Sequence, residues 1–233
     1  MAFVSKKRKE QLTKVDRTKL YTFDEAIELI KGSASAKFDE TLEIHCRLGV
    51  DPRHADQQVR STLSLPHGTG KTKRVLVLTT GDTAEAKEAG ADEIGGVDAV
   101  DRIKAGWLDF DAVIATPEMM RHIGPLGKVL GPRGMMPSAK AGTVTANVGE
   151  AVREIKAGRI EYRVDKFGNT HNGIGKLSFS KEQLVENAKA YYDAIMKSRP
   201  AAVKGTYLKS MTLSSTMGCG YRISTTDPTA ESK

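Results

Sequence analysis

The hydrophobic positions in the middle of the chain come in short continuous runs. Residues 73–80 (KRVLVLTT) and 112–115 (AVIA) are apolar without alternation, a pattern typical of strands buried on both faces. Stretches of helical character lie at 82–90, 97–106 and 145–158, and each ends at a glycine. Strands that alternate with helices predict βαβ units and a parallel sheet covered on both sides.

The two ends of the chain follow a different pattern. In residues 41–48 (TLEIHCRL) apolar and polar side chains alternate, which indicates a strand with one buried face. Further strands of this kind are expected at 58–65, 160–164, 174–179 and 209–213, and a Gly- and Asn-rich loop would join the two central ones as a hairpin. Helices that cover the sheet are predicted from the capping box Thr22–Glu25 to Gly32, and from Ser180 to the residue before Pro200.

An antiparallel pattern that is interrupted and then resumes predicts a mixed α/β fold in two domains. Residues 1–67 and 159–233 would form a split terminal α+β domain, with an antiparallel sheet and covering helices. Residues 68–158 would form an inserted Rossmann-like, three-layer α/β domain. The glycines at 68–70 and 158 are the expected hinges.

The charge distribution adds a partner class to this outline. The chain carries a net charge of +7, but residues 68–158 hold 12 basic and 12 acidic residues. The counts are 12 and 10 for residues 1–67, and 12 and 7 for residues 159–233. The excess of positive charge therefore belongs to the split domain, which favours a polyanionic partner such as nucleic acid.

The compartment follows from what the composition lacks. No apolar run is long enough to span a bilayer, and the first twelve residues turn basic without the apolar core of a signal peptide. Two cysteines do not make a disulfide framework. We therefore expect a cytoplasmic protein that does not associate with membranes.

A glycine-rich stretch, PHGTGKTKR at 66–74, invites a nucleotide-binding interpretation. A P-loop needs a glycine separated by four residues from the Gly-Lys pair, where this chain has Leu65, and a helix after the loop, where a strand is predicted. The better interpretation is a hinge with basic flanks. The five histidines and two cysteines show no metal-ligand spacing, and no nucleophile motif is present, so we expect no metal, no cofactor and no enzymatic activity.

Three other segments carry groups that suit RNA. Residues 121–144 are rich in glycine and contain four cations without an acidic residue: Arg121, Lys128, Arg133 and Lys140. These could contact phosphates, or the segment could be a surface loop that is basic by chance. Lys37 and Phe38 precede a strand, where the aromatic ring could stack on RNA or belong to the core. The hairpin tip at 163–171 could contact phosphates and 2′-hydroxyls, or be merely solvated.

Several long motifs resemble the L-one family of bacterial large-subunit ribosomal proteins. They are FDETLEI, LGVDPRHADQQVRSTLSLPHGTGK, GPLGKVLGPRGMMP, KAGTV, GRIEYRVDK and KGTYLKSMTLSSTMGCG, and they extend over about residues 23–221. The resemblance implies a split RNA-binding domain with a Rossmann-like insert. It also implies a structural constituent of the large ribosomal subunit, a monomer when free, at the mobile stalk beside the tRNA exit site.

The same resemblance implies partners and contact residues. The partners are large-subunit rRNA, deacylated exit-site tRNA whose release the protein assists, other ribosomal components, and its own operon mRNA, whose translation it represses. The RNA contacts that match the family's motifs are Lys37, Phe38, Thr41, Arg163, Asp165, Lys166, His171, Ser210, Ser214, Thr216, Met217 and Gly218. The resemblance thus favours RNA stacking for Phe38 over a place in the core.

The chain departs from the family pattern at three places. Cys219 stands where a proline is usual, Asn172-Gly173 replaces a proline before I-G-K, and Ser138-Ala139 replaces Asn and Pro. The first two changes predict looser loops beside the RNA contacts, and an oxidation-sensitive Cys219. Two rival hypotheses remain: an enzyme whose insert binds a nucleotide, although GDTAEA after the first strand has a single glycine, and a generic basic RNA chaperone.

Overall fold

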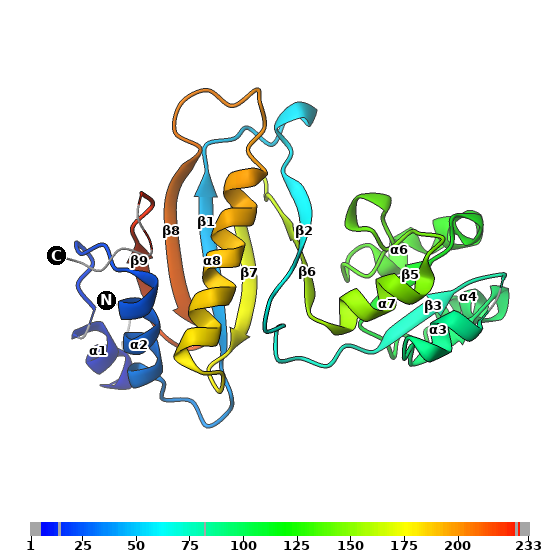
Figure 1. Ribbon diagram of the computed structural model, residues 1–233, viewed down its shortest axis with the longest axis horizontal. Coiled ribbons are helices and arrows are strands. Elements are labelled where there is room, and N and C mark those ends of the chain that lie inside the picture. The colour runs from blue at the N-terminus through cyan, green and yellow to red at the C-terminus, as the bar shows by residue number, and fades with distance from the viewer. Residues whose placement is uncertain (1–5, 14, 82, 227, 229–233) are drawn as a thin grey trace. The chain divides into compact units, whose positions relative to one another are not determined.

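The computed structural model describes residues 6–13, 15–81, 83–226 and 228. The chain divides into two compact units, one of Met1–Gly70 with Tyr162–Lys233 and one of Lys71–Glu161 (Figure 1). They are called the split unit and the inserted unit below, and each is described by itself. Whether residues 1–67 and 159–233 form a domain that folds without the rest stays a prediction.

The split unit is built on a four-stranded antiparallel sheet whose one face carries two helices (Figure 1). The strand order is β7 (Asn169–Lys176), β1 (Thr41–Leu48), β8 (Leu208–Ser215) and β9 (Gly220–Ile223). Helices α2 (Phe23–Ser33) and α8 (Lys181–Lys197) pack against each other and against this sheet. The apolar residues of β1 face these helices and are buried, as the alternation predicts: Leu42, Ile44, Cys46 and Leu48.

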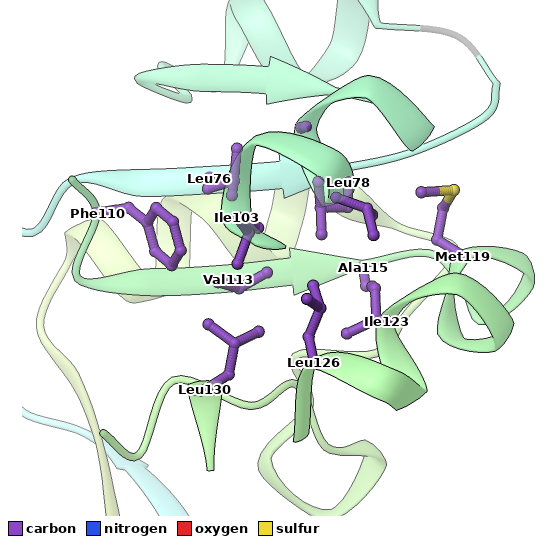
Figure 2. Packing of buried hydrophobic residues seen from close by; sticks show 12 residues of the cluster. Leu76, Leu78, Ile103, Phe110, Val113, Ala115, Met119, Ile123, Leu126 and Leu130 are labelled. Atoms are coloured by element: carbon purple, nitrogen blue, oxygen red, sulfur yellow. The ribbon is translucent and has the colours of Figure 1, made fainter. Parts of the chain in front are cut away.

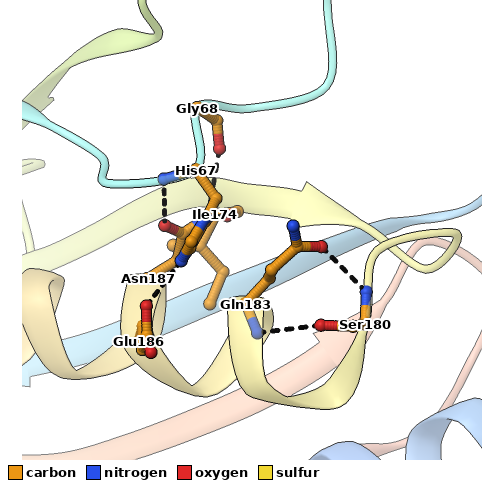
Figure 3. A network of polar contacts seen from close by, with 7 residues as sticks. All are labelled: His67, Gly68, Ile174, Ser180, Gln183, Glu186 and Asn187. Carbon is orange, nitrogen blue, oxygen red and sulfur yellow. Dashed lines mark hydrogen bonds and ion pairs between the residues drawn. The ribbon is translucent and has the colours of Figure 1, made fainter.

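Both covering helices begin at the caps expected from the sequence. The Ser180 hydroxyl accepts a hydrogen bond from the Gln183 N–H, and the Gln183 side chain accepts one from the Ser180 N–H, which completes a capping box (Figure 3). The Thr22 hydroxyl accepts from the Glu25 N–H in the same way. A shorter helix, α1 (Lys6–Thr13), precedes them and was not predicted.

A buried asparagine ties α8 to strand β7 and to the segment that follows β2. Asn187 donates to the carbonyl oxygens of Gly68 (3.0 Å) and Ile174 (2.8 Å), and it accepts from the His67 N–H (3.1 Å; Figure 3). His67 also contacts Glu186 on the same helix. This network secures the segment that leaves the split unit, because all three polar groups of the buried amide are satisfied.

The predicted hairpin at 160–179 is wrong in its pairing and in both bounds of its second strand, which was expected at 174–179. Strand β6 (Arg159–Arg163) pairs with β2 (Arg60–Ser64) in a separate two-stranded sheet, whereas β7 pairs with β1. Strand β7 starts at Asn169, within the expected loop. Only the five residues 164–168 connect the two strands, and the Asp165 N–H donates to the Asn169 carbonyl (2.8 Å) across this turn.

The inserted unit is a three-layer α/β structure, in agreement with the predicted fold class. Its parallel sheet has the order β4 (Glu93–Gly95), β3 (Val75–Leu78) and β5 (Ala112–Ala115). On one side, α3 (Ala84–Glu88) and α7 (Val148–Lys156) bury Val75, Val77 and Ile114. On the other side, α4 (Val97–Lys104) and the turns after β5 enclose a second cluster (Figure 2). The predicted cap of α3 at residue 82 lies outside the described residues.

The segment after β5, where Pro117 and the following EMMRHIG predict a helical turn, is helical there and stays so in the glycine-rich part that follows. It is a chain of short helical turns: η2 (Pro117–Met119), α5 (Met120–Ile123), η3 (Gly124–Leu126), α6 (Gly127–Leu130) and, later, η4 (Ala139–Ala141). A similar turn, η1 (Ala55–Gln57), lies in the split unit. Met119, Ile123, Leu126 and Leu130 point into the core of the inserted unit, which explains the regular spacing of apolar residues there (Figure 2).

Candidate nucleic-acid interface

The side of the sheet opposite the two helices presents polar side chains. This surface, called the open face below, consists of the alternate residues of the four strands: Thr41, Glu43, His45, Arg47, Asn169, His171, Ser210, Thr212, Ser214 and Arg222. These side chains are exposed or half-buried. Of the predicted contact residues, Thr41, His171, Ser210 and Ser214 lie on it, so the fold brings together groups far apart in sequence.

Glu40 organises one end of the open face. Its buried carboxylate accepts hydrogen bonds from the Ser215 hydroxyl (2.6 Å), the Met217 N–H (3.0 Å) and the Ala36 N–H (3.4 Å). Burial acts to raise its pKa, but these hydrogen bonds outweigh that effect and hold the pKa of Glu40 below its ordinary value. The carboxylate thus stays charged and holds the β8–β9 turn against the segment before β1.

The same end presents two apolar side chains to solvent. Phe38 is 55% exposed and Met217 is 60% exposed, so Phe38 does not belong to the core. Next to Met217 in the chain, the Thr216 hydroxyl accepts from the Thr41 N–H (3.0 Å), and the Thr216 N–H donates to the Thr41 carbonyl (3.2 Å). Lys37 is exposed beside Phe38. The β8–β9 turn therefore presents the thioether of Met217 and the hydroxyl of Thr216. The segment before β1 presents the aromatic ring of Phe38 and the ammonium group of Lys37.

The turn after Met217 is tightly packed. A Cβ at Gly218 would come closer to Ser215 Oγ than real Cβ atoms come, and the Gly218 carbonyl accepts from Arg8 (2.9 Å). Cys219 is buried, contrary to the expectation of a loose, oxidation-sensitive residue in place of the family's proline. The reason is that β9 begins directly after it, at Gly220, and fixes the turn by pairing with β8.

A second rigid turn lies at the other end of β7. Burial alone would raise the pKa of Asp165, but hydrogen bonds from the N–H groups of Asn169 and Phe167 (2.8 Å each) and from the Asn169 side chain lower it. The turn presents Arg163 and Lys166 as exposed cations and Phe167 as an 82% exposed ring. These groups fit RNA phosphates and bases by type, and the charged Asp165 holds the backbone that presents them.

Three residues of this surface were missed from the sequence. Glu40 lies inside the FDETLEI motif, but nothing in its spacing shows that it binds residues 215–217. His45 lies on the polar side of a predicted strand, and only the strand register places it against His171. Phe167 lies in the predicted hairpin tip at 163–171, where its exposure could have been suspected from the flanking Lys166 and Gly168.

The inserted unit offers different surfaces. Arg121, Lys128, Arg133 and Lys140 are all exposed on the helical turns after β5. At the carboxyl ends of β3 and β5, a hollow of about 410 Å³ is lined by polar groups that include two carboxylates, Glu85 and Glu118. Negative charge at this edge is unfavourable for binding the phosphate of a nucleotide. The glycine-rich segment at 68–70 is also followed by β3 and not by the helix that a P-loop requires.

Metal-ligand clusters and membrane-spanning helices are both absent from the described residues. Among them, no group of three or more His, Cys, Asp or Glu side chains is arranged to hold a metal ion. Within the same ranges, no helix has the length and apolarity required to cross a membrane.

The fold and the site together define a class: an α/β protein in two units, whose antiparallel sheet presents a polar face bordered by cations and exposed apolar side chains. A family model described as "Ribosomal protein L1p/L10e family" matches residues 29–219, which is most of the chain. The chain therefore belongs to this family, which confirms the resemblance found in the motifs. It is a structural protein of the large ribosomal subunit that binds rRNA, and its family is not a family of enzymes.

Proposed function

We propose that the open face, with the turns at its two ends, is the surface that binds a folded segment of large-subunit rRNA. The observation that supports this most strongly is spatial. The predicted contact residues come from separate parts of the sequence, yet Thr41, His171, Ser210 and Ser214 share one sheet face, with Lys37, Phe38, Thr216, Met217 and Gly218 at one end and Arg163, Asp165 and Lys166 at the other.

The mechanism is recognition of RNA shape by a preformed surface. Hydrogen bonds to Glu40 and Asp165 hold the two end turns, so little conformational entropy is lost when RNA binds. Hydroxyls on β8 and its turn suit 2′-hydroxyls and phosphate oxygens, whereas Phe38 and Met217 suit the flat face of a base or ribose. The surrounding Lys and Arg supply affinity that decreases as salt increases.

We further propose the finer roles that the family resemblance implies. The protein would act at the mobile stalk beside the tRNA exit site, assist the release of deacylated tRNA, and repress translation of its own operon mRNA by binding a similar RNA structure. The exposed cations of the inserted unit, Arg121, Lys128, Arg133 and Lys140, are the groups we propose to face tRNA or RNA. Off the ribosome the protein would be a monomer.

The test is a binding titration with large-subunit rRNA, guided by footprinting of the purified protein on total rRNA. Thr216→Val should weaken binding by about 1–3 kcal/mol, because it leaves polar partners in the RNA and the Thr41 N–H unsatisfied. Thr216→Ser keeps the hydroxyl and should restore most of the affinity.

Thr83→Val in the inserted unit is the matched control, since Thr83 is exposed and makes no side-chain cap hydrogen bond. Equal affinity of the wild type and Thr216→Val would refute the role of Thr216. A footprint on rRNA that persists when Phe38 and Met217 are both replaced by alanine, at unchanged affinity, would argue against the whole surface.

A further inference from the structure

Two imidazoles contact each other near the centre of the open face. His45 of β1 stands opposite His171 of β7 in the strand register, and their Nδ1 atoms are 2.9 Å apart. At this distance one nitrogen must donate a hydrogen bond and the other must accept it, so at least one of the two rings is neutral. The pair can therefore hold one proton charge as it stands, and a second proton would break the contact.

The outer nitrogens of the pair have partners of their own. His45 Nε2 lies 3.1 Å from Ser214 Oγ on β8 and 3.8 Å from a carboxylate oxygen of Glu43. His171 Nε2 lies 3.7 Å from a carboxylate oxygen of Asp165 in the β6–β7 turn. The cations nearest in register are Arg47, two positions along β1, and Arg222 of β9, opposite the Thr212 that pairs with His45.

These surroundings set the proton affinity of the pair in the free protein. Partial burial of His45 and the neighbouring His171 lower the pKa of His45, while Glu43 acts in the opposite direction. These effects together favour the neutral form of His45 in the free protein. An anion bound over the two imidazoles would favour their protonated form. It adds a hydrogen-bond acceptor and a negative charge, which both stabilise a protonated imidazole.

We propose that His45 and His171 form a phosphate-binding site within the open face, and that the protein takes up a proton there when RNA binds. This inference rests on the proposed RNA-binding role of that face. It adds His45 as a contact residue, an RNA phosphate as the group that the pair binds, and a dependence of the affinity on pH. The RNA phosphate would accept hydrogen bonds from the pair, and Ser214 beside His45 offers a further hydroxyl.

The sign of the pH dependence follows from linkage. RNA binding raises the proton affinity of the pair, so the added affinity is present at low pH and is lost as pH rises. One linked proton can change the affinity by at most about tenfold per pH unit. At constant ionic strength, we expect the wild type to bind rRNA about tenfold more tightly at pH 6 than at pH 8.

The experiment titrates the full chain with a large-subunit rRNA transcript from pH 5.5 to 8.5. His45→Gln and His171→Gln should each flatten the pH profile: whatever affinity either variant loses at pH 8, its gain in affinity from pH 8 to pH 6 should be only a small part of the wild-type gain. His54→Gln is the matched control: His54 is well exposed, lies outside the open face and is near Asp51. Its pH profile should parallel that of the wild type.

A second measurement on the wild type does not depend on how the variants fold. Calorimetric titration at pH 7 in buffers of different ionisation enthalpy reports the protons taken up on binding, and we expect uptake that His45→Gln abolishes. Binding with no proton uptake, or with pH profiles that are parallel in wild type and His45→Gln, would overturn the inference alone. Absence of rRNA binding at every pH would overturn the proposed function together with it.

Discussion

At the scale of single residues, Glu40 joins segments that are 175 positions apart in the sequence. A buried carboxylate is costly unless hydrogen bonds compensate it, and here a hydroxyl and two backbone N–H groups do so. In the proposed mechanism Glu40 does not contact the RNA itself. Its role is to hold Thr216 and Met217 in place, so its loss should affect stability as well as binding.

Glu40→Gln should lower the free energy of unfolding by about 1–3 kcal/mol at pH 7. The NH₂ of the new amide cannot accept a hydrogen bond, so at least one donor that now binds the carboxylate would lose its acceptor. The pKa of Glu40 is depressed in the folded state, so its contribution exists above the ordinary value of 4.5 and disappears as pH falls below it. The gap between wild type and variant should therefore shrink in acid. Urea denaturation at pH 7 and about pH 3 checks this, with Glu88→Gln, an exposed site, as the control. A gap that is constant with pH would contradict the assignment.

Gly218→Ala tests the packing of the same turn. The new Cβ would press on Ser215 Oγ, whose hydroxyl is already held by Glu40, and the strain should cost about 1–3 kcal/mol. Gly32→Ala is the control, since nothing lies within 4 Å of a Cβ there. Gly32 lies in helix α2, so alanine should stabilise the protein slightly. Thermal unfolding of the two variants should move in opposite directions, and equal shifts would show that the turn is loose.

At the scale of elements, the sequence predicted the main helices and strands, but it did not predict α1, β4 or β9, and it misplaced β7. In β7, Thr170 and Asn172 do not follow the apolar alternation, so they were interpreted as loop residues. The Tyr191 hydroxyl of α8 contacts both of them, Thr170 Oγ1 at 3.1 Å and Asn172 Oδ1 at 3.0 Å. Polar residues can lie on the covered side of a sheet when the covering helix provides a hydrogen-bond partner for them. A pattern of hydrophobic positions cannot predict such a partner.

Asn187 offers the corresponding test of how elements are held together. Asn187→Ala removes three hydrogen bonds and leaves the Gly68 and Ile174 carbonyls without their donor (Figure 3). We expect a loss of about 2–4 kcal/mol in the free energy of unfolding and faster hydrogen exchange at the His67 amide. Asn147→Ala, at an exposed N-cap without a side-chain hydrogen bond, should be nearly neutral. Unchanged exchange at His67 would mean that Asn187 does not anchor this segment.

At the scale of the whole molecule, the distribution of charge follows the division of the chain into two units. The excess of basic residues belongs to the two ends of the chain, which fold into one unit, while the inserted unit is close to neutral. Non-specific RNA affinity depends on cations near phosphates, so we expect the split unit to account for most of it.

A chain of residues 1–67 joined to 159–233 should therefore bind large-subunit rRNA within a few-fold of the full protein. The slope of log affinity against log salt should be nearly the same for both, and Lys37→Ala should reduce it by about one. Filter binding over a series of salt concentrations measures both quantities. Much weaker binding by the shortened chain, once its fold is verified, would show that the inserted unit takes part.

The sequence by itself determined the class of the two units, the caps of α2 and α8, the family and the basic character of the ends. These features depend on local periodicity, capping and composition, which neighbouring residues express directly. Only the tertiary structure decided that β6 pairs with β2, that Cys219 is buried, and that Glu40 and the His45–His171 pair organise the open face. Each of these depends on which distant strands become neighbours, and the free energy of that pairing lies in contacts that no single segment contains.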